Sequence, residues 1–346
     1  MEILQRLTET VRERNLTVVL PEGRDERIIQ AARRLHDEGI ARPVVLGRQD
    51  QIEVAIQKAG VGVDEIVFID PRNSDRLDAY VKAYQRRRNL IDETVARNVV
   101  VKPLFFAGMM VACGDADAFV GGAAIASSVI LQAGVLTVGL KAGIQTPSSY
   151  FLMVIPARNG EPDKLLLYAD CAVNISPSSE QLADIALATA ATARQILDEE
   201  PRVAMLSFST QGSASGSGVS KVTEALRLVR AREPGLAVDG EFQLDTALVS
   251  DVAIRKAPAG GRVAGKANVF IFPDLNSGNI AYKVTQYMAH ARAVGPILQG
   301  FARPISDLSR GTLVDDIIAA VILTLAQAPA GQPKSAARNL FRTVKV

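Results

Sequence analysis

The sequence predicts an α/β protein made of two α/β domains with mostly parallel sheets. Short β-branched runs recur early in the chain, with helical patterns between them, at 16–21, 42–47, 65–70 and 117–122. This alternation is typical of parallel sheets covered by helices. A chain of 346 residues also exceeds the usual size of a single hydrophobic core, which favours two domains.

The segment 24–39 is the clearest helix of the first block. Its apolar residues fall on one face, and the pattern ends at a glycine. Those apolar residues are Ile28, Ile29, Ala32 and Leu35. An apolar face of this kind indicates a helix that packs against a sheet.

Residues 118–140 carry no charge and are long enough to cross a bilayer. Small and polar residues, however, divide the stretch into strand, turn, helix and strand, and no cluster of cations follows it. These interrupting residues are Gly121, Gly122, Ser127, Ser128, Gln132, Gly134 and Gly139. We therefore interpret the stretch as buried structure and expect no membrane partner.

The second block begins near residue 148. Two runs, 148–156 and 164–170, flank the turn-prone 157–163, which predicts an antiparallel hairpin. Helices are expected at 178–197, 219–231, 279–292 and 313–327, strands at 202–209 and 268–273, and an apolar, Pro-bounded segment at 293–304. The predicted domains are a discontinuous one, 1–147 plus 296–346, and a second one, 148–295.

The amino-acid composition indicates which kinds of partner and which compartment to expect. Charged residues make up 22% of the chain, and Lys and Arg (39) nearly balance Asp and Glu (37), which gives no reason to expect nucleic acid. The two cysteines, Cys113 and Cys171, form neither a disulfide framework nor a metal cluster, as is usual in a reducing compartment. The N-terminus has no apolar signal-peptide core, so we expect a cytoplasmic protein.

A Gly/Ser loop, residues 212–218, follows a buried strand and opens a helix. Backbone N–H groups in such a place, at Gly212 and Ser213 among others, favour an anion such as phosphate. The loop matches neither the dinucleotide fingerprint nor a Walker loop. A plain flexible connection is the alternative.

The segment 307–316 brings polar functions together within a few residues. Arg310 offers a fork that matches phosphate or an oxyanion, Ser309 is a short donor, and an aspartate one turn later is a proton acceptor. Because consecutive helix positions diverge by roughly 100°, only one of Asp315 and Asp316 is expected to face a given reactive atom. Helix capping is the alternative for both.

The histidines, one cysteine and a run of arginines are weaker candidates for functional residues. His36 and His290 are interpreted as solvated residues, so a Ser-His-Asp triad is not expected. Cys171 has no neighbouring histidine or arginine to stabilise a thiolate, which favours a small buried residue. The run 86–88 of three arginines is read as a solvated helix face or as a phosphate contact.

Longer sequence motifs carry more information than these single residues. In the second half of the chain they are YADCAVNISPSSEQLADIA (168–186), PRVAMLSFSTQGSA (201–214), DGEFQLDTALV (239–249), GKANVFIFPDLNSGNIAYK (265–283) and GPILQGFARPISDLSRG (295–311). In the first half they are LPEGRDERIIQAA, PVVLG and FFAGMMVACGDADAFVGGA. Through these motifs the sequence resembles the phosphotransacetylase family.

The resemblance implies a two-domain architecture related to isocitrate dehydrogenase, a homodimer, an active site in the interdomain cleft, and no metal or organic cofactor. Carried onto this chain, it implies Ser309, Arg310 and Asp316 as catalytic residues. It implies Arg87, Asn279 and Lys283 as substrate-binding residues.

One segment departs from the family pattern. Relatives usually carry a histidine-threonine-rich stretch ending in arginine, whereas residues 125–133 here include Ser128 and have Gln132 in place of that arginine. Gln211 likewise stands where relatives often have lysine. These differences concern phosphate binding and leave Ser309, Arg310 and Asp316 untouched.

The mechanism implied by the resemblance is direct. Asp316 takes the thiol proton of coenzyme A, the thiolate attacks the carbonyl of acetyl phosphate, and phosphate leaves. A non-catalytic sensor of acyl-CoA or acyl phosphate is the main alternative, motivated by Gln132. Transfer of a longer acyl group, propionyl or butyryl, also stays open, because a methylene changes discrimination by only about 1–3 kcal/mol. A decarboxylating dehydrogenase is a further alternative. It would need a cluster of metal-binding aspartates and a nucleotide-binding loop, and the sequence shows neither.

Overall fold

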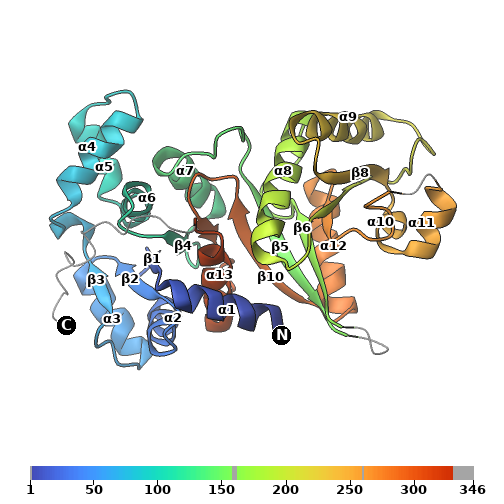
Figure 1. Cartoon of the computed structure of the whole chain (residues 1–346). Helices are drawn as coiled ribbons and strands as arrows, with labels where there is room; N and C mark the ends of the chain where they lie inside the picture. Colours follow the sequence, from blue (N-terminus) through green and yellow to red (C-terminus); the bar gives the residue numbers. More distant parts are fainter. Residues whose placement is uncertain (1, 158–161, 259–260, 330–346) are drawn as a thin grey trace. The chain divides into compact units, whose positions relative to one another are not determined.

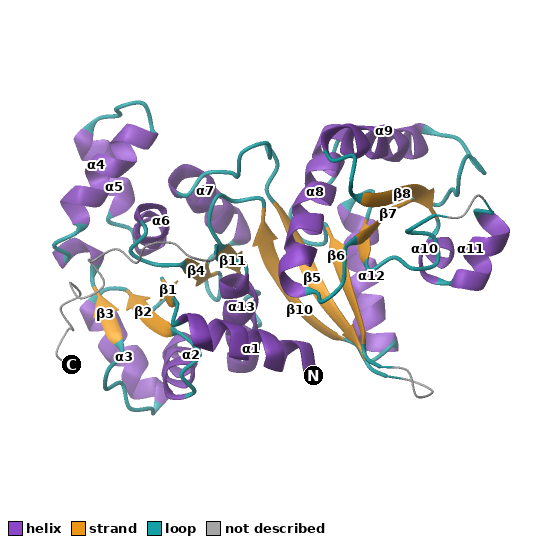
Figure 2. Ribbon diagram, viewed as in Figure 1, coloured by secondary structure: helices purple, strands orange, loops and turns teal. Residues whose placement is uncertain are grey.

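The computed structural model describes residues 2–157, 162–258 and 261–329 (Figure 1). These residues form two compact units. The flanking unit comprises residues 2–141 together with those from 301 onward, and the central unit comprises 142–300. The domain limits predicted from the sequence, after residues 147 and 295, stay a prediction. The fold class is confirmed, since each unit is a sheet flanked by helices (Figure 2).

The sheet of the flanking unit is entirely parallel, with the order β11-β4-β1-β2-β3. Its strands are β1 (Thr17–Leu20), β2 (Arg42–Leu46), β3 (Val67–Ile69), β4 (Ala118–Gly121) and β11 (Ile305–Asp307). The first four lie inside the predicted runs. The fifth returns from the far end of the chain to pair with β4, through Asp307 opposite Gly121.

Helices precede, connect and follow these strands along the chain. They are α1 (Glu2–Arg14), α2 (Glu26–Asp37), α3 (Gln49–Ala59), α4 (Leu77–Arg87), α5 (Glu93–Val100), α6 (Pro103–Cys113), α7 (Ser127–Thr137) and α13 (Val314–Ala326), with a short 3₁₀ turn at Pro71–Asn73. The predicted apolar face of α2 is buried. Asp25 begins this helix by accepting the backbone N–H of Arg27, which is the usual way a helix N-terminus is capped.

The uncharged stretch 118–140 folds as strand β4, turn and helix α7, and it ends in a bridge between Leu140 and Phe301. Within the described ranges, no single helix is long and apolar enough to cross a membrane. Helices α5 and α6 together have the required length and composition, but the pair is bent by 100°.

The central unit has a mixed sheet with the order β10-β5-β6-β9-β7-β8. The strands are β5 (Ser148–Ile155), β6 (Lys164–Ala169), β7 (Arg202–Leu206), β8 (Ala237–Phe242), β9 (Val269–Ile271) and β10 (Arg292–Gln299). The predicted hairpin is confirmed, because β5 and β6 pair antiparallel; part of its turn, 158–161, lies outside the described residues. The pairs formed by β6, β9, β7 and β8 are parallel.

The helices of the central unit are α8 (Ser179–Ile196), α9 (Ser217–Arg232), α10 (Leu244–Leu248), α11 (Ser250–Lys256) and α12 (Leu275–Met288). The predicted helix 279–292 was misplaced. It begins four residues earlier because Asp274 caps it, accepting the Ser277 N–H at 2.9 Å. Residues 292–299 instead form β10, which pairs antiparallel with β5.

Candidate active site

Most of the predicted site residues of the flanking unit lie just after the carboxyl ends of neighbouring parallel strands. Strands β11, β4 and β1 lie side by side and run in the same direction, so the loops that follow them share one edge of the sheet. Ligands of open α/β sheets bind at that edge. Ser309 and Arg310 follow β11, and the turn into α7 follows β4.

Ser309 and Arg310 are exposed. The Thr312 N–H donates to the Ser309 carbonyl at 2.9 Å and closes a tight turn. The carbonyl of Arg310 accepts a hydrogen bond from Arg27 at 3.0 Å, so the backbone of the turn is held from outside. The guanidinium of Arg310 makes no hydrogen bond within residues 2–329 as described, which leaves its five donors available to a ligand.

The two aspartates at the start of α13 have different partners. The carboxylate of Asp316 accepts the Leu313 N–H at 3.1 Å, while Asp315 pairs with Arg34 on α2 at 2.5 Å. Both side chains are exposed. Asp316 therefore caps its helix as the alternative reading expected, and its other carboxylate oxygen is still able to take a proton.

Glu22, which follows β1, was not among the predicted residues. Its buried carboxylate accepts three consecutive backbone N–H groups after β4, from Gly122 at 2.6 Å, Ala123 at 2.9 Å and Ala124 at 2.7 Å. These N–H groups form a concave anion site that the protein fills with its own side chain. The turn into α7 is thereby fixed to the end of β1.

Asp307, the last residue of β11, is the second residue that sequence reasoning left without a role. It is 3% exposed, and its Oδ1 has no hydrogen-bond partner among the described residues. Burial raises the pKa of Asp307 to about 6, and the charge of Glu22 adds to the rise, while the Ser127 hydroxyl and the Leu308 N–H act against it. An acidic residue at or shortly after the carboxyl end of a buried parallel strand was the available signal for both.

Ser128 and Gln132 lie on α7, and both are exposed. A spacing of four residues places them on the same face of the helix. Gln132 therefore has room for a longer side chain. Arg87, at the end of α4, instead donates to the Ala112 carbonyl at the end of α6 at 3.0 Å. That hydrogen bond does not involve the segment 307–316.

In the central unit, the Gly/Ser loop after β7 is tied to a buried glutamate. Glu241, 3% exposed, accepts the Gly212 N–H at 2.8 Å and the Ser209 hydroxyl at 2.7 Å. Ser213 accepts the Thr210 N–H at 3.0 Å. The first N–H of the predicted anion site is thus already bonded inside the protein, and an anion at this loop would bind at the beginning of α9.

Asn279 and Lys283 lie one turn apart on α12. Asn279 donates to the Cys171 carbonyl at 3.1 Å and accepts from Lys283 at 3.0 Å. The helix lies close to the loop after β6 because of Gly278, where a Cβ would come within 2.2 Å of the Asp170 carbonyl. The structure therefore brings these two residues to the carboxyl ends of β6 and β9.

Cys171 itself is fully buried in the apolar core of the central unit. Burial raises the pKa of the Cys171 thiol well above its usual range, and the charge of Asp170 adds to this. The prediction of a small buried residue is confirmed. The histidines lie elsewhere: His36 contacts Glu65 at 3.1 Å, and His290 is exposed.

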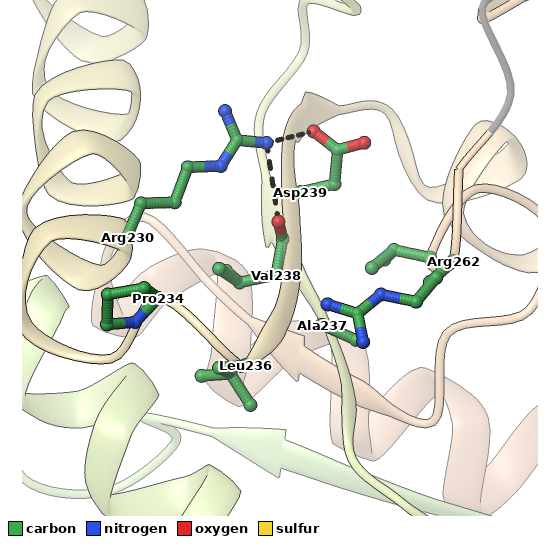
Figure 3. A pocket seen from close by; sticks show the side chains of 8 residues that line it. Arg230, Pro234, Leu236, Ala237, Val238, Asp239 and Arg262 are labelled. Carbon is green, nitrogen blue, oxygen red and sulfur yellow. Dashed lines mark hydrogen bonds and ion pairs between the residues drawn. The ribbon is translucent and has the colours of Figure 1, made fainter.

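A hollow of about 290 Å³ lies at the amino end of β8 (Figure 3). Figure 3 shows that Arg230 on its rim is bonded to Asp239 and to the Val238 carbonyl. Arg262, on the opposite side, donates to the Gly235 carbonyl at 3.3 Å. No predicted site residue lines this hollow, and it lies at the end of the strand opposite to the Gly/Ser loop, so we do not assign the active site to it.

The chain is similar to known proteins along nearly its whole length. The model of the phosphate acetyl/butaryl transferase family matches residues 2–325. The phosphate acetyltransferase of Clostridium acetobutylicum is 40% identical over 333 residues, covering 96% of this chain and all of the relative. That of Bacillus subtilis is 38% identical, covering 94% and 99%.

A solved structure shows the same fold. The EutD phosphotransacetylase from Staphylococcus aureus superimposes with a TM-score of 0.87 at 36% identity, covering 95% of this chain and 98% of that one. The resemblance seen in the sequence motifs is therefore confirmed along nearly the whole chain, and the chain belongs to the phosphate acetyl/butaryl transferase family.

Proposed function

We propose that the protein is a phosphate acetyltransferase, which moves an acetyl group between coenzyme A and inorganic phosphate. The observation that carries the proposal is the exposed group of Ser309, Arg310 and Asp316, within eight residues at the carboxyl edge of the flanking sheet. The resemblance of the motifs implies a catalytic role for these same residues. Named relatives with this activity match from end to end.

Asp316 is the proposed base. Its exposed carboxylate takes the proton of the coenzyme A thiol, and the sulfur attacks the acetyl carbonyl carbon. The bond between that carbon and the phosphate oxygen then breaks, and the departing phosphate takes the proton from Asp316. An ordinary thiol and an ordinary aspartic acid differ by about 4.6 pKa units, or roughly 6 kcal/mol, so the site must favour the thiolate. A cation close to the sulfur lowers that difference.

Arg310 is the proposed source of this cation. Its planar guanidinium is free to hold the phosphoryl oxygens at two points and to offset the negative charge that develops on the carbonyl oxygen. The Ser309 hydroxyl, next to it, donates to the same oxygen. Both groups therefore stabilise the transition state more than the ground state, which is what raises a rate constant.

The direct test is turnover by the purified protein. Acetyl phosphate and coenzyme A should give acetyl-CoA and phosphate, and acetyl-CoA with phosphate should give the reverse reaction. Binding of coenzyme A without any transfer would identify a sensor instead. Rates with acetyl, propionyl and butyryl phosphate decide the acyl group, and we expect acetyl to be the best substrate.

We further propose that the reaction needs no metal and no organic cofactor. Coenzyme A and phosphate are then the substrates, and charge at the reacting centre is handled by Arg310. Activity should persist in excess EDTA and without nicotinamide. Loss of transfer in EDTA, restored by a divalent ion, would contradict this proposal.

A homodimer in the cytoplasm is the proposed state. It is supported by an apolar face of α12 that is exposed in the single chain, at Ile280, Val284, Tyr287 and Met288. Their spacing places them along one side of the helix, and apolar surface of this kind marks protein contacts. Tyr287→Asp should shift the mass measured by light scattering from dimer to monomer. An unchanged mass would exclude this face as the contact.

A further inference from the structure

The guanidinium of Arg27 lies where two loops of the flanking unit meet α2. From the first turn of that helix it donates to the Ala123 carbonyl at 3.0 Å, in the turn after β4. It also donates to the carbonyls of Arg310 at 3.0 Å and Thr312 at 2.9 Å, in the turn after β11. Residues 283 and 285 positions away in the sequence are thus bonded to one side chain.

Asp25 orients this guanidinium. It accepts from Nε of Arg27 at 3.0 Å and from Nη2 at 2.7 Å, which is the parallel two-point pairing that fixes an arginine plane. The two bonds to Asp25 and the three to backbone carbonyls use all five donors of the side chain. Arg27 therefore has no donor left for a substrate.

We propose that Arg27 is a positioning residue for the acyl transfer, because it holds the backbone of the turn from which Ser309 and Arg310 project. This inference rests on the proposed function. Arg27 does not touch the substrates in this role. It acts by fixing the carbonyls on both sides of Gly311, so that the Arg310 side chain starts from a defined backbone.

The exposure of the turn explains why it needs the hydrogen bonds from Arg27. Ser309, Arg310 and Gly311 are all exposed, so few packing contacts restrain them. A displacement of about 1 Å at a catalytic group costs roughly 10²-fold in rate, because the charge must be in place before the reaction. Lysine would not replace Arg27, since one ammonium on a flexible stem cannot span three carbonyls and a carboxylate.

A second set of contacts connects Arg27 to the turn that leads to α7. Ala123, whose carbonyl accepts from Arg27, donates its own N–H to the buried carboxylate of Glu22 at 2.9 Å. Residue 123 is therefore held from both sides. The turn that leads to α7 and the turn that carries Arg310 share Arg27 as a common partner, so a change in Arg27 reaches both.

The first experiment compares Arg27→Ala and Arg27→Lys with Arg33→Ala. Arg33 lies on the same helix, with a side chain 24% exposed against 27% for Arg27, and it pairs with Asp37. Both Arg27 variants should lower kcat by about 100-fold while the KM for coenzyme A stays within about threefold. Arg33→Ala should leave both constants near wild type. Circular dichroism spectra check that each variant is folded.

Chemical rescue separates positioning from general damage. Guanidinium chloride at non-denaturing concentration should restore kcat of Arg27→Ala at least tenfold, because the free cation fits the space that the side chain has left. Arg33→Ala and the wild type should show no gain. A folded Arg27→Ala protein that keeps its kcat, or one whose loss guanidinium does not relieve at all, would overturn the proposal.

A third measurement does not depend on catalysis. Trypsin cleaves after arginine by attacking the carbonyl carbon, and in the wild type the oxygen of the Arg310 carbonyl accepts a hydrogen bond from Arg27. Cleavage between Arg310 and Gly311, followed by mass spectrometry, should be about tenfold faster in Arg27→Ala and unchanged in Arg33→Ala. If the wild type transfers no acetyl group, the proposed function fails. If it does transfer while cleavage after Arg310 stays equally slow in Arg27→Ala, the positioning role fails.

Discussion

Arg34 on α2 pairs with Asp315 at the start of α13, at 2.5 Å, whereas among the described residues the neighbouring Asp316 accepts a single hydrogen bond, from the backbone N–H of Leu313. The two adjacent aspartates therefore differ in their partners. Asp315 forms an ion pair with an arginine of the same unit, whereas Asp316 keeps one carboxylate oxygen exposed to solvent.

The first prediction follows from this difference. Asp316→Asn should lower kcat by about 10²–10⁴-fold, because the variant loses the proposed base. Its amide oxygen is still able to accept the Leu313 N–H, so stability should change by less than about 1 kcal/mol. Steady-state rates and urea unfolding measure the two effects.

Asp315→Asn is the control. It breaks an ion pair whose side chains are 46% and 72% exposed, which is worth about 0.2–1 kcal/mol. Its kcat should stay near wild type. Equal, mild effects of the two substitutions on turnover would reduce both aspartates to structural residues.

The second prediction concerns the missing arginine on α7. Gln132 is exposed, one turn after Ser128, so an arginine fits there without displacing the core. Gln132→Arg should lower the KM for acetyl phosphate about tenfold, the size of one charge-assisted hydrogen bond. Gln132→Met, of similar length without charge, should leave that constant unchanged. A constant that stays the same in Gln132→Arg would mean that α7 does not contact the phosphoryl group.

A third prediction tests direct transfer. Cys171 is fully buried, and burial raises the pKa of its thiol, so it is a poor nucleophile at neutral pH. Cys171→Ala should keep most of its turnover and lose about 1 kcal/mol of stability from the small cavity. Mass spectrometry of the acid-quenched reaction should detect no acetylated cysteine. An acetyl group trapped on this residue would require a two-step mechanism.

The fourth prediction is a pH dependence of stability from Asp307. Its pKa of about 6, against an ordinary value of 3.8, means that the folded protein binds the proton more tightly than the unfolded chain. Its contribution to stability is therefore complete below pH 3.8 and is lost as the pH rises through 6, by roughly 3 kcal/mol in total.

Asp307→Asn removes the ionisation. The variant should be more stable than wild type at pH 8, by up to that amount, and the advantage should shrink as the pH falls toward 4. Urea unfolding at a series of pH values measures it, and Asp50→Asn, an exposed position, should show no such trend. A constant difference between Asp307→Asn and wild type at all pH values would show that Asp307 does not titrate in this range.

The sequence by itself determined the local elements. The alternation of β-branched runs with amphipathic segments predicted the strands β1 to β4 and helix α2, because burial on one face leaves a period in the sequence. The motifs indicated Ser309, Arg310 and Asp316 as candidate catalytic residues, since all three lie within one short segment. These are properties of neighbouring residues, which the order of amino acids displays directly.

Only the tertiary structure decided which distant segments meet. Strand β10 was not predicted, because its pairing with β5 depends on a partner more than a hundred positions away. The side chain of Glu22 bonds to the backbone of Gly122, and that of Arg27 to the backbone of Arg310. The spacing of residues along the chain does not predict either hydrogen bond. Such contacts form because parallel strands bring their carboxyl ends to one edge of a sheet, where buried charges must find hydrogen-bond partners.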